Sequence, residues 1–242
     1  MRAHRLEKED VMRVTELIPS VEHRMRAYHE LSARVKSMSK GTPPKPTITL
    51  SREFGCEAYP VAEEVVKLAE KATGEQWLLV DISLLDSVAK EHHIPEELML
   101  SLGNKPRWLD DMFATFSPHW KTDSDYYRLL VEQVVMIATA GNAVFVGLGA
   151  AIITQSMNNC THFRLIADQD FKVRSIARRM NIPKQDADIM IVDQQKERDK
   201  IIRKLLDADE HYPLHYHAIF NNGKVRNKQI ARTIIDFVFG EK

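Results

Sequence analysis

The sequence predicts an α/β fold in which a doubly wound parallel sheet is covered by helices on both faces. Short apolar runs alternate with longer amphipathic stretches along residues 46–242. The apolar runs are hydrophobic throughout, as expected of strands that are buried on both faces of a parallel sheet. Strands that alternate with helices in this way are joined by right-handed crossovers.

Five segments are predicted as strands and seven as helices. The strands are Thr47–Leu50, Trp77–Val80, Ala143–Val146, Phe163–Ala167 and His217–Phe220. The helices are Val61–Lys71, Ser83–His92, Pro95–Leu102, Asp125–Thr139, Asp170–Met180, Lys184–Leu206 and Asn227–Phe239. Ligands bind at the carboxyl ends of the strands in folds of this class, so we expect functional residues there.

The first 45 residues are predicted to form a helical appendage and a linker, separate from the α/β domain of residues 46–242. Apolar residues recur at helical spacing from about residue 8 to residue 38, with an interruption at Pro19. Residues 40–46 contain one glycine and three prolines, which is typical of a stiff linker. The apolar face of the appendage needs a cover, either the body of the chain or a second copy in a homodimer.

The composition excludes several classes of protein. The chain has 34 basic and 34 acidic residues, so no overall charge attracts nucleic acid or an anionic membrane. No apolar run approaches the ~20 residues that span a bilayer, and the N-terminus lacks the apolar core of a signal peptide. Cys56 and Cys160 are too few for a disulfide framework. We therefore expect a cytoplasmic protein without nucleic-acid or membrane partners.

The most informative motif lies where the first predicted strand meets the first helix of the α/β domain. Residues Ser51–Pro60 (SREFGCEAYP) lead from an apolar strand into an amphipathic helix. Helix N-termini have free N–H groups and partial positive charge, so anions bind there. An ordinary phosphate loop reads G-x-x-x-x-G-K-[ST], but residues 56–60 contain no lysine, serine or threonine, and we take Ala58 and Pro60 to stand in for the lysine and the hydroxyl residue. The sequence indicates an anion-binding turn that lacks these side chains.

Arg52 is the cation of this loop, and two interpretations of it stay open. Its guanidinium provides a substitute clamp for phosphate groups, a role that suits the forked geometry of arginine. Alternatively, the segment is a plain strand–helix turn in which Arg52 pairs with Glu53 or Glu57. The pattern alone does not separate the two interpretations.

A second glycine-containing segment follows the predicted strand Ala143–Val146. Gly147 and Gly149 flank Leu148 at the carboxyl end of this strand. Glycines there allow the backbone to approach a ligand closely. For an isolated G-x-G, however, close packing of the strand on a helix is the favoured interpretation.

Basic residues cluster on two predicted helices, and ten histidines are spread over the chain. The basic clusters lie within residues 172–179 and 196–204, and acidic residues are interleaved around the second of them. This interleaving is typical of a solvated helix face. The histidines have no cysteine or carboxylate partners at the spacing of a zinc site, so no metal site is predicted from them.

Taken together, these segments resemble the cytidylate kinase-like family, a branch of the P-loop nucleoside monophosphate kinases. The resemblance extends from about Pro46 to the C-terminus, and six short segments recur in the family's order. They are Ser51–Gly55, Val80–Leu85, Val144–Ala150, Arg164–Ala167, Gln195–Arg198 and Tyr216–Asn221. The chain departs from the family pattern at Cys56-Glu57-Ala58 (Ser-Gly-Gly in the family), at Leu148 (arginine) and at Gln195 (aspartate).

The resemblance implies a P-loop kinase-like sheet of five parallel strands with a helical lid. It also implies phosphate transfer from ATP, with Mg²⁺, to a nucleotide. The residues that it assigns to donor phosphates are Ser51, Arg52, Gly55, Cys56, Glu57 and Ala58. In this interpretation Arg198 closes over the phosphates from the lid with help from Lys196 and Arg203, and Asp81 lies near the acceptor. The alternative for Asp81 is a helix N-cap.

Two functions therefore stay open. The first is an ATP-dependent kinase of a nucleoside monophosphate or another small acceptor, in which Arg52, Arg198 and Asp81 act in catalysis. The second is a catalytically inactive protein that binds a nucleotide or another anion and signals through its N-terminal helices. The retained Arg52 and Arg198 favour the kinase, whereas Ala58, Pro60 and Leu148 favour the inactive protein. We expect transfer from ATP to CMP to be slow or absent.

Overall fold

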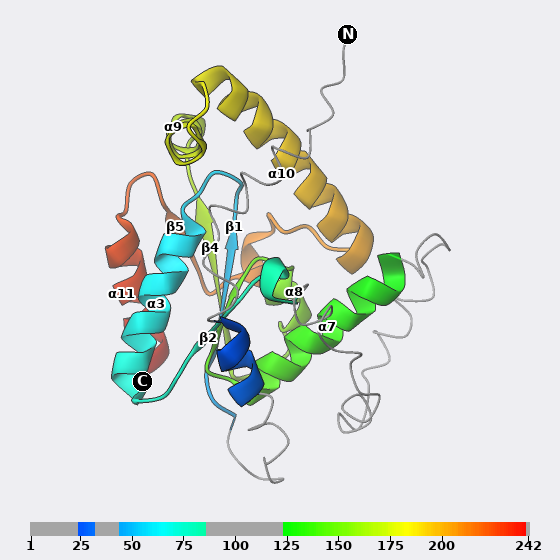
Figure 1. Cartoon of the computed structure of the whole chain (residues 1–242), viewed down its shortest axis with the longest axis vertical. Coiled ribbons are helices and arrows are strands. Elements are labelled where there is room, and N and C mark those ends of the chain that lie inside the picture. Colours follow the sequence, from blue (N-terminus) through cyan, green and yellow to red (C-terminus); the bar gives the residue numbers. More distant parts are fainter. Residues whose placement is uncertain (1–23, 32–43, 86–122, 241–242) are drawn as a thin grey trace.

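A parallel sheet of five strands forms the centre of the protein (Figure 1). The structure is a computed structural model, and it describes residues 24–31, 44–85 and 123–240, with side chains from residue 130 onward in the last range. The strands are β1 (Thr47–Arg52), β2 (Leu78–Val80), β3 (Ala143–Val146), β4 (Cys160–Ile166) and β5 (Ala218–Asn221). Their order is β2-β3-β1-β4-β5, and every neighbouring pair is parallel. The predicted α/β fold is confirmed.

Helices cover both faces of this sheet, as a doubly wound fold requires. One face carries α3 (Ala58–Thr73) and α11 (Asn227–Phe239), and the other carries α7 (Asp123–Ala140) and α8 (Ala150–Ile153) (Figure 1). Side chains along a strand alternate between the two faces. Val144 and Val146 of β3 accordingly pack with α3 and α11, whereas Ala143 and Phe145 pack in the cluster that contains α7. Burial on both faces explains why the strand is apolar at every position.

A helical hairpin lies beyond the carboxyl ends of the strands (Figure 1). It consists of α9 (Gln169–Met180) and α10 (Lys184–Leu206). Asp168 caps α9 by accepting a hydrogen bond from the backbone nitrogen of Phe171 at 2.7 Å. The hairpin has a small core of its own, and Phe54 from the loop after β1 packs into it. The other buried members of this core are Ile176, Met180, Ala187 and Ile191.

Residues 24–31 form a helical segment that packs against the body of the same chain. Met25, Tyr28 and Leu31 are buried in the cluster that contains α7 and β2. The Tyr28 hydroxyl donates a hydrogen bond to Gln133 Oε1 at 2.7 Å. This part of the predicted appendage is therefore covered in cis, while the division of the chain at residue 45 and the homodimer stay predictions.

Several predicted elements lie outside the described residues. These are the helix Pro95–Leu102, most of the helix Ser83–His92 and most of the N-terminal helical region. Residues 82–85 begin a helix directly after Asp81. None of the helices in the described part of the chain is long and apolar enough to cross a membrane.

Candidate functional site

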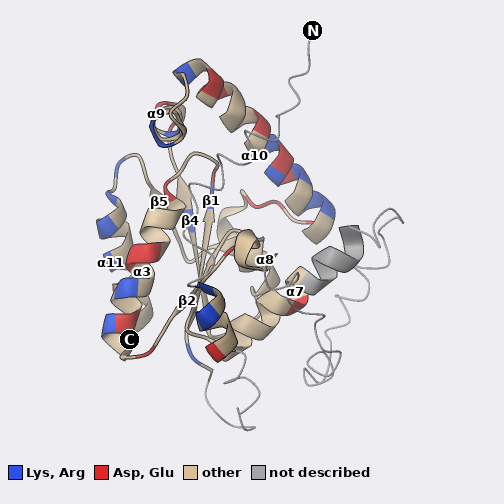
Figure 2. Cartoon of the chain, viewed as in Figure 1, with Lys and Arg blue, Asp and Glu red and all other residues tan. Residues whose placement is uncertain are grey.

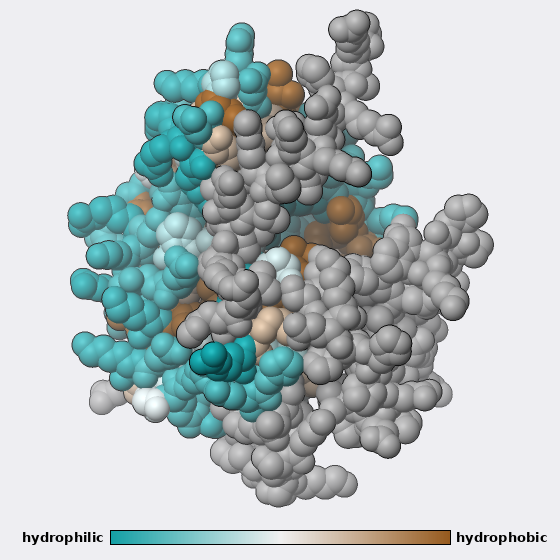
Figure 3. Space-filling model, viewed as in Figure 1, coloured by the Kyte–Doolittle hydropathy of each residue, from teal (hydrophilic) through white to brown (hydrophobic). Residues whose placement is uncertain are grey.

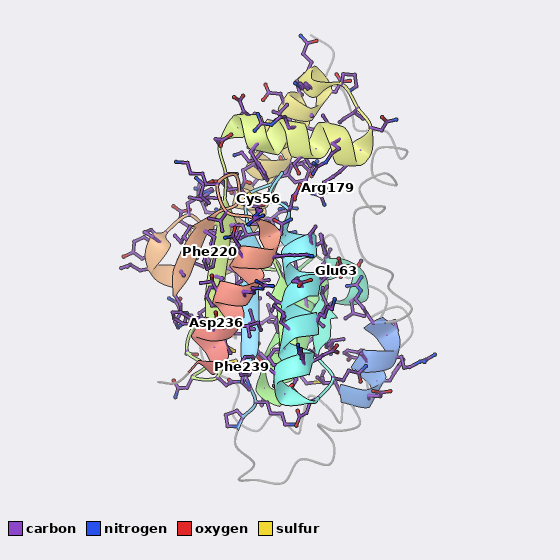
Figure 4. The ribbon with its side chains drawn as sticks, turned by 90° about the vertical axis from the view of Figure 1, so that its left-hand side faces the viewer. Cys56, Glu63, Arg179, Phe220, Asp236 and Phe239 are labelled. Carbon is purple, nitrogen blue, oxygen red and sulfur yellow. The ribbon has the colours of Figure 1, made fainter. Side chains whose placement is uncertain are left out.

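The loop after β1 lies at the carboxyl edge of the sheet, beneath the α9–α10 hairpin. Gly55 in this loop has φ +100°, a conformation that side chains other than glycine rarely adopt. A Cβ atom on Gly55 would lie 2.6 Å from Cβ of Lys172, so α9 packs directly on the glycine. Figure 4 shows Cys56 of the loop and Arg179 of α9 at this end of the molecule, with Phe239 at the opposite end. The loop is thus held by its own backbone and by the hairpin.

Most N–H groups of the loop already have partners within the protein. Phe54 N donates to Gln195 Oε1 at 2.7 Å, and Cys56 N donates to the Glu53 carbonyl oxygen at 3.2 Å. Glu57 N donates to Asn222 Oδ1 at 2.7 Å. The N–H groups of Cys56 and Glu57, which the resemblance assigns to donor phosphates, are therefore already used within the protein. Within the described residues, the N–H groups of Gly55 and Ala58 have no partner.

The Glu57 carboxylate lies among cationic and polar groups at the start of α3. Its Oε1 accepts hydrogen bonds from Arg178 Nη2 at 2.6 Å and from Ser175 Oγ at 3.2 Å. Its Oε2 accepts a hydrogen bond from Asn227 Nδ2 at 2.7 Å. Helix N-termini attract anions, and here a carboxylate of the chain itself lies beside one. The Glu57 side chain therefore places a negative charge in the loop itself.

A basic cavity of about 560 Å³ opens beside Glu57, and we call it the Glu57 cavity. It lies between α9 and the segment that joins β5 to α11. Its basic lining residues are Arg174, Arg178, Lys224 and Arg226. Figure 2 shows Lys and Arg on α9 and on the segment that leads into α11. Lys224 and Arg226 were missing from the sequence prediction, although their position just after a parallel strand was a signal for them.

Arg52 points away from the Glu57 cavity and crosses the end of β3. A Cβ atom on Gly147 would lie 1.9 Å from Arg52 Nη1, so this glycine makes room for the guanidinium. Gly149 has a different role, because a Cβ there would lie 2.4 Å from Cδ1 of Leu206 in α10. Gly149 therefore agrees with the packing interpretation of the G-x-G segment, whereas Gly147 receives a side chain of the same chain, and a close approach to a ligand there stays a prediction. Arg52 pairs with neither Glu53 nor Glu57, which bind Lys172 and Arg178.

Arg198 of α10 lies over the loop, with Cζ 5.0 Å from the centre of the Phe54 ring. Its Nη1 atom is buried without a hydrogen-bond partner among the described residues. Burial, and next the charge of Arg52, lower the pKa of Arg198 to about 9, so the guanidinium is still charged at neutral pH. Two neighbouring positive charges thus face each other without a bound carboxylate between them.

The cavity beside Arg52 and Arg198 has a volume of about 530 Å³, and we call it the Arg198 cavity. Leu148 lines this cavity at the position where the family has arginine. Its backbone has φ +64°, which is uncommon for a leucine, and its side chain packs against the core around α7. Where the family has an arginine, this chain therefore has an aliphatic side chain in the wall of the cavity.

Asp81 is fully buried and makes four interactions with the protein. Oδ1 accepts hydrogen bonds from Arg24 Nη1 at 2.7 Å, Ser83 Oγ at 2.8 Å and Leu84 N at 3.0 Å. Oδ2 accepts one from the Tyr59 hydroxyl at 2.8 Å. Burial opposes ionisation, but the Arg24 charge and these hydrogen bonds together lower the pKa of Asp81 below its usual value. These contacts agree with the alternative in which Asp81 caps the helix that begins at residue 82. The sequence analysis did not identify Arg24 as a partner of Asp81.

Lys196 and Arg203 do not join Arg198. Both are exposed and line a cavity on another side of α10, together with Lys172 and Lys200. Successive helical residues are about 100° apart, so positions two and five residues from Arg198 fall on different faces. The predicted grouping of these three cations is therefore not present in the structure.

Two further predicted residues are held inside the protein. Ser51 is buried and shares a hydrogen bond with Tyr216. The Cys56 side chain is buried too, and burial, followed by the charge of Glu53, raises the pKa of its thiol to about 12. Neither residue presents a polar group to a ligand in this arrangement.

The Mg²⁺ that the resemblance implies has no fitting ligands in the described residues. Each carboxylate near the loop is already paired: Glu53 with Lys172, Glu57 with Arg178 and Asp81 with Arg24. Pro60 has no hydroxyl to offer. In the parts of the chain that the structure describes, no group of three or more histidine, cysteine or acidic side chains is placed to hold a metal ion.

Comparison with known proteins finds one family and a similar fold. The sequence matches the cytidylate kinase-like family over residues 47–224. A crystal structure of an uncharacterized protein from Eubacterium ventriosum ATCC 27560 is similar, with a TM-score of 0.66 and 19% sequence identity. That similarity covers 81% of this chain and 99% of the other. At this identity it supports the fold alone. A search of curated proteins finds no match.

Proposed function

The chain belongs to the cytidylate kinase-like family, and we propose that it binds ATP and transfers phosphate to a small anionic acceptor. The observation that carries this proposal is the pair of cavities on either side of the loop Ser51–Pro60. Phosphoryl transfer needs a donor and an acceptor that meet across a loop of N–H groups and cations. The Glu57 cavity suits the donor, and the Arg198 cavity suits the acceptor.

The donor binds where basic residues surround the start of α3. Arg174, Arg178, Lys224 and Arg226 supply four positive charges around the Glu57 cavity. The triphosphate extends from there toward the free N–H groups of Gly55 and Ala58. To reach them it displaces the Glu57 carboxylate from Arg178, because both anions compete for the same guanidinium. Binding of ATP therefore includes the cost of breaking an internal ion pair.

The acceptor meets Arg52 and Arg198. Two guanidinium groups without bound carboxylates stabilise negative charge that develops during transfer, and they do so without reorganising. Asp81 cannot act as the general base in this arrangement, since both of its oxygens accept hydrogen bonds in a fully buried site. An acceptor oxygen that is already ionised needs no base. We therefore propose that the acceptor is anionic. Asp81 has a positioning role, because it orients Tyr59 and the start of the helix at residue 82.

The second candidate is an inactive protein that binds an anion and regulates a partner. The specific observation in its favour is Glu57, which places a permanent anion at the donor side of the loop. The lack of fitting ligands for Mg²⁺ in the described residues points the same way. In this case a nucleotide binds weakly and is not turned over.

The experiment that separates these candidates compares Glu57→Gln with Glu63→Gln, a matched change at an exposed position of α3. We expect Glu57→Gln to bind ATP about fivefold more tightly, because one partly exposed ion pair contributes up to ~1 kcal/mol. ATP binding is measured by thermal shift and calorimetry, and ADP release by a coupled assay with a panel of anionic acceptors. ADP release supports the kinase, whereas ATP binding without ADP release supports the inactive protein. An ATP affinity that neither Glu57→Gln nor Arg178→Gln changes contradicts the donor site.

A further inference from the structure

The Arg198 cavity has a charged end and an aliphatic body. Arg52 lies at the charged end, where Gly147 leaves room for its guanidinium. Arg198 faces the same space from α10, with a buried Nη1 that has no hydrogen-bond partner within the described residues. Tyr59 also lines this end, but its hydroxyl is already used in a hydrogen bond to Asp81. Lys204 of α10 lines the cavity too, so its charged lining residues are three cations and the carboxylate of Glu210.

The rest of the lining is aliphatic and comes largely from three elements. These side chains include Leu130 and Val134 of α7, Leu148 and Ile153 near α8, and Ile201 and Leu205 of α10. Ile82, next to Asp81, and Ile201 are 40% and 49% exposed, respectively, which is high for residues of this kind. In Figure 3 hydrophobic surface gathers in a hollow below the C-terminal half of α10.

This lining does not suit a nucleoside. A base is recognised by stacking on an aromatic ring and by hydrogen bonds to its polar edges. Tyr59 is the one aromatic residue among the described lining residues, and its hydroxyl is bound to Asp81. The acidic lining residue Glu210 lies beside Arg164, with 3.8 Å between Glu210 Oε1 and Arg164 Nη1. The wall that would face a base and a ribose is aliphatic.

We propose that the Arg198 cavity binds a phosphate monoester with an aliphatic body in place of a nucleoside monophosphate. The two guanidinium groups, with Lys204 offset by Glu210, match the charge of a phosphate monoester, which is close to −2 at neutral pH. A carboxylate would leave one guanidinium without a counter-charge. The aliphatic walls contact the hydrocarbon part of the ligand, and binding strengthens with the apolar area that is covered.

The inference rests on the proposed function for one step only, the chemistry that follows binding. A phosphate oxygen of the ligand forms a bond to the γ-phosphorus of ATP. The bond from that phosphorus to the β,γ-bridging oxygen breaks, and ADP leaves with the electron pair. The attacking oxygen is already ionised, so no proton has to be removed, and this agrees with the saturated contacts of Asp81. The product is a diphosphate monoester.

The test measures binding by calorimetry for methyl, butyl and hexyl phosphate, with inorganic phosphate, hexanoate and CMP as comparisons. We expect hexyl phosphate to bind about tenfold more tightly than butyl phosphate, because each buried methylene contributes up to roughly fourfold. We expect hexanoate and CMP to bind at least about tenfold more weakly than hexyl phosphate. Equal affinity for all alkyl phosphates, or tighter binding of CMP than of hexyl phosphate, would overturn the proposal.

Variants assign this binding to the two ends of the cavity. Arg198→Gln should weaken hexyl phosphate at least about tenfold, whereas Arg203→Gln on another face of α10 should leave it unchanged. Ile201→Asn should reduce the preference for longer chains while inorganic phosphate binds as before. Its control is Ile189→Asn, at another exposed isoleucine of α10 that does not line the cavity. If both isoleucine variants behave alike, the aliphatic wall is not the binding surface.

The binding and ADP-release measurements together distinguish a failure of this inference from a failure of the proposed function. Alkyl phosphate binding without ADP release would leave the inference standing and remove the kinase. ADP release with CMP, but with none of the alkyl phosphates, would keep the kinase and remove the inference. Arg198→Gln should fold normally, because it removes a buried charge whose Nη1 has no hydrogen-bond partner in the described residues.

Discussion

The two cavities beside the loop Ser51–Pro60 differ in how the protein treats its own cations. In the Glu57 cavity, Arg178 already contacts a carboxylate of the same chain at 2.6 Å. In the Arg198 cavity, Arg52 and Arg198 have no such contact among the described residues. A ligand in the first cavity replaces an internal anion, whereas a ligand in the second supplies a missing one. The same type of side chain is therefore expected to contribute far more to ligand binding and catalysis in the second cavity.

The largest effect expected from this difference is on turnover. Arg52→Gln or Arg198→Gln should each lower kcat/KM for phosphoryl transfer by about 10²–10³, because each removes a preorganised charge from the reacting groups. Arg178→Gln should change KM for ATP by less than about tenfold, since its charge is already balanced by Glu57. Rates of ADP release across acceptor concentrations give both parameters. Equal losses in all three variants would show that the cavities do not differ as described.

A second comparison is between buried and exposed charge pairs, and it concerns stability. Asp81→Asn should lower the free energy of unfolding by about 3 kcal/mol, because it breaks the buried ion pair between Asp81 and Arg24. Glu197→Gln, which removes an exposed pair with Lys200, should change it by less than about 0.5 kcal/mol. Urea unfolding of the two variants measures both values. A small loss in Asp81→Asn would mean that this buried ion pair contributes little to stability.

The sheet beneath the cavities provides a test that should leave ligand binding alone. His162 is buried beside Thr49, and burial, followed by the nearby His217, lowers its pKa to about 4. In the unfolded chain the pKa of this histidine is near its ordinary value of ~6.5. Between these values the unfolded chain binds a proton and the folded protein does not, so stability should fall as the pH decreases from about 6.5 to 4.

The slope that His162 contributes is at most about 1.4 kcal/mol per pH unit. Urea unfolding between pH 4 and 7 measures it, and His162→Gln should remove this part of the slope. The affinity for inorganic phosphate should be the same in His162→Gln as in the unchanged chain. A change in that affinity would mean that the sheet and the Arg198 cavity are coupled.

The smallest effect expected is that of the Glu57 charge on the affinity for ATP. Removing its charge in Glu57→Gln should tighten ATP binding about fivefold and leave alkyl phosphate binding unchanged, because the Arg198 cavity does not include Glu57. Calorimetry with each ligand in turn measures the two affinities. A parallel rise in both would indicate that the cavities share one electrostatic environment, and it would weaken the comparison above.

Much of the fold was predictable from local patterns. The helices Lys184–Leu206 and Asn227–Phe239 and the strand Ala143–Val146 have the predicted bounds. Each has a strong periodic or fully apolar pattern, and such patterns depend on neighbours in the sequence. The short helix α8 is not among the predicted helices, because its four residues are too few to show a helical period.

The candidate site was harder to predict because its contacts join distant parts of the chain. The Glu57 carboxylate binds Arg178 and Asn227, which are 121 and 170 residues away, and no local pattern links them. Lys196 and Arg203 were grouped with Arg198 by charge alone. The face of α10 that packs inward is determined by apolar residues such as Ile191 and Ile202, and it separates these cations. The sequence pattern predicted the helix, but the packing of α10 determines which of its residues lie near the loop.

One contact in the hairpin also constrains its motion. Phe54 belongs to the loop, yet its ring lies in the core of the hairpin, and its N–H is bound to Gln195 of α10. Lifting the hairpin would expose this ring to water, at a cost of up to about 3 kcal/mol, and would break that hydrogen bond. The hairpin and the loop are thus mechanically linked, so opening one disturbs the other. A ligand that enters under the hairpin on one side would in this way alter the loop that a ligand meets on the other.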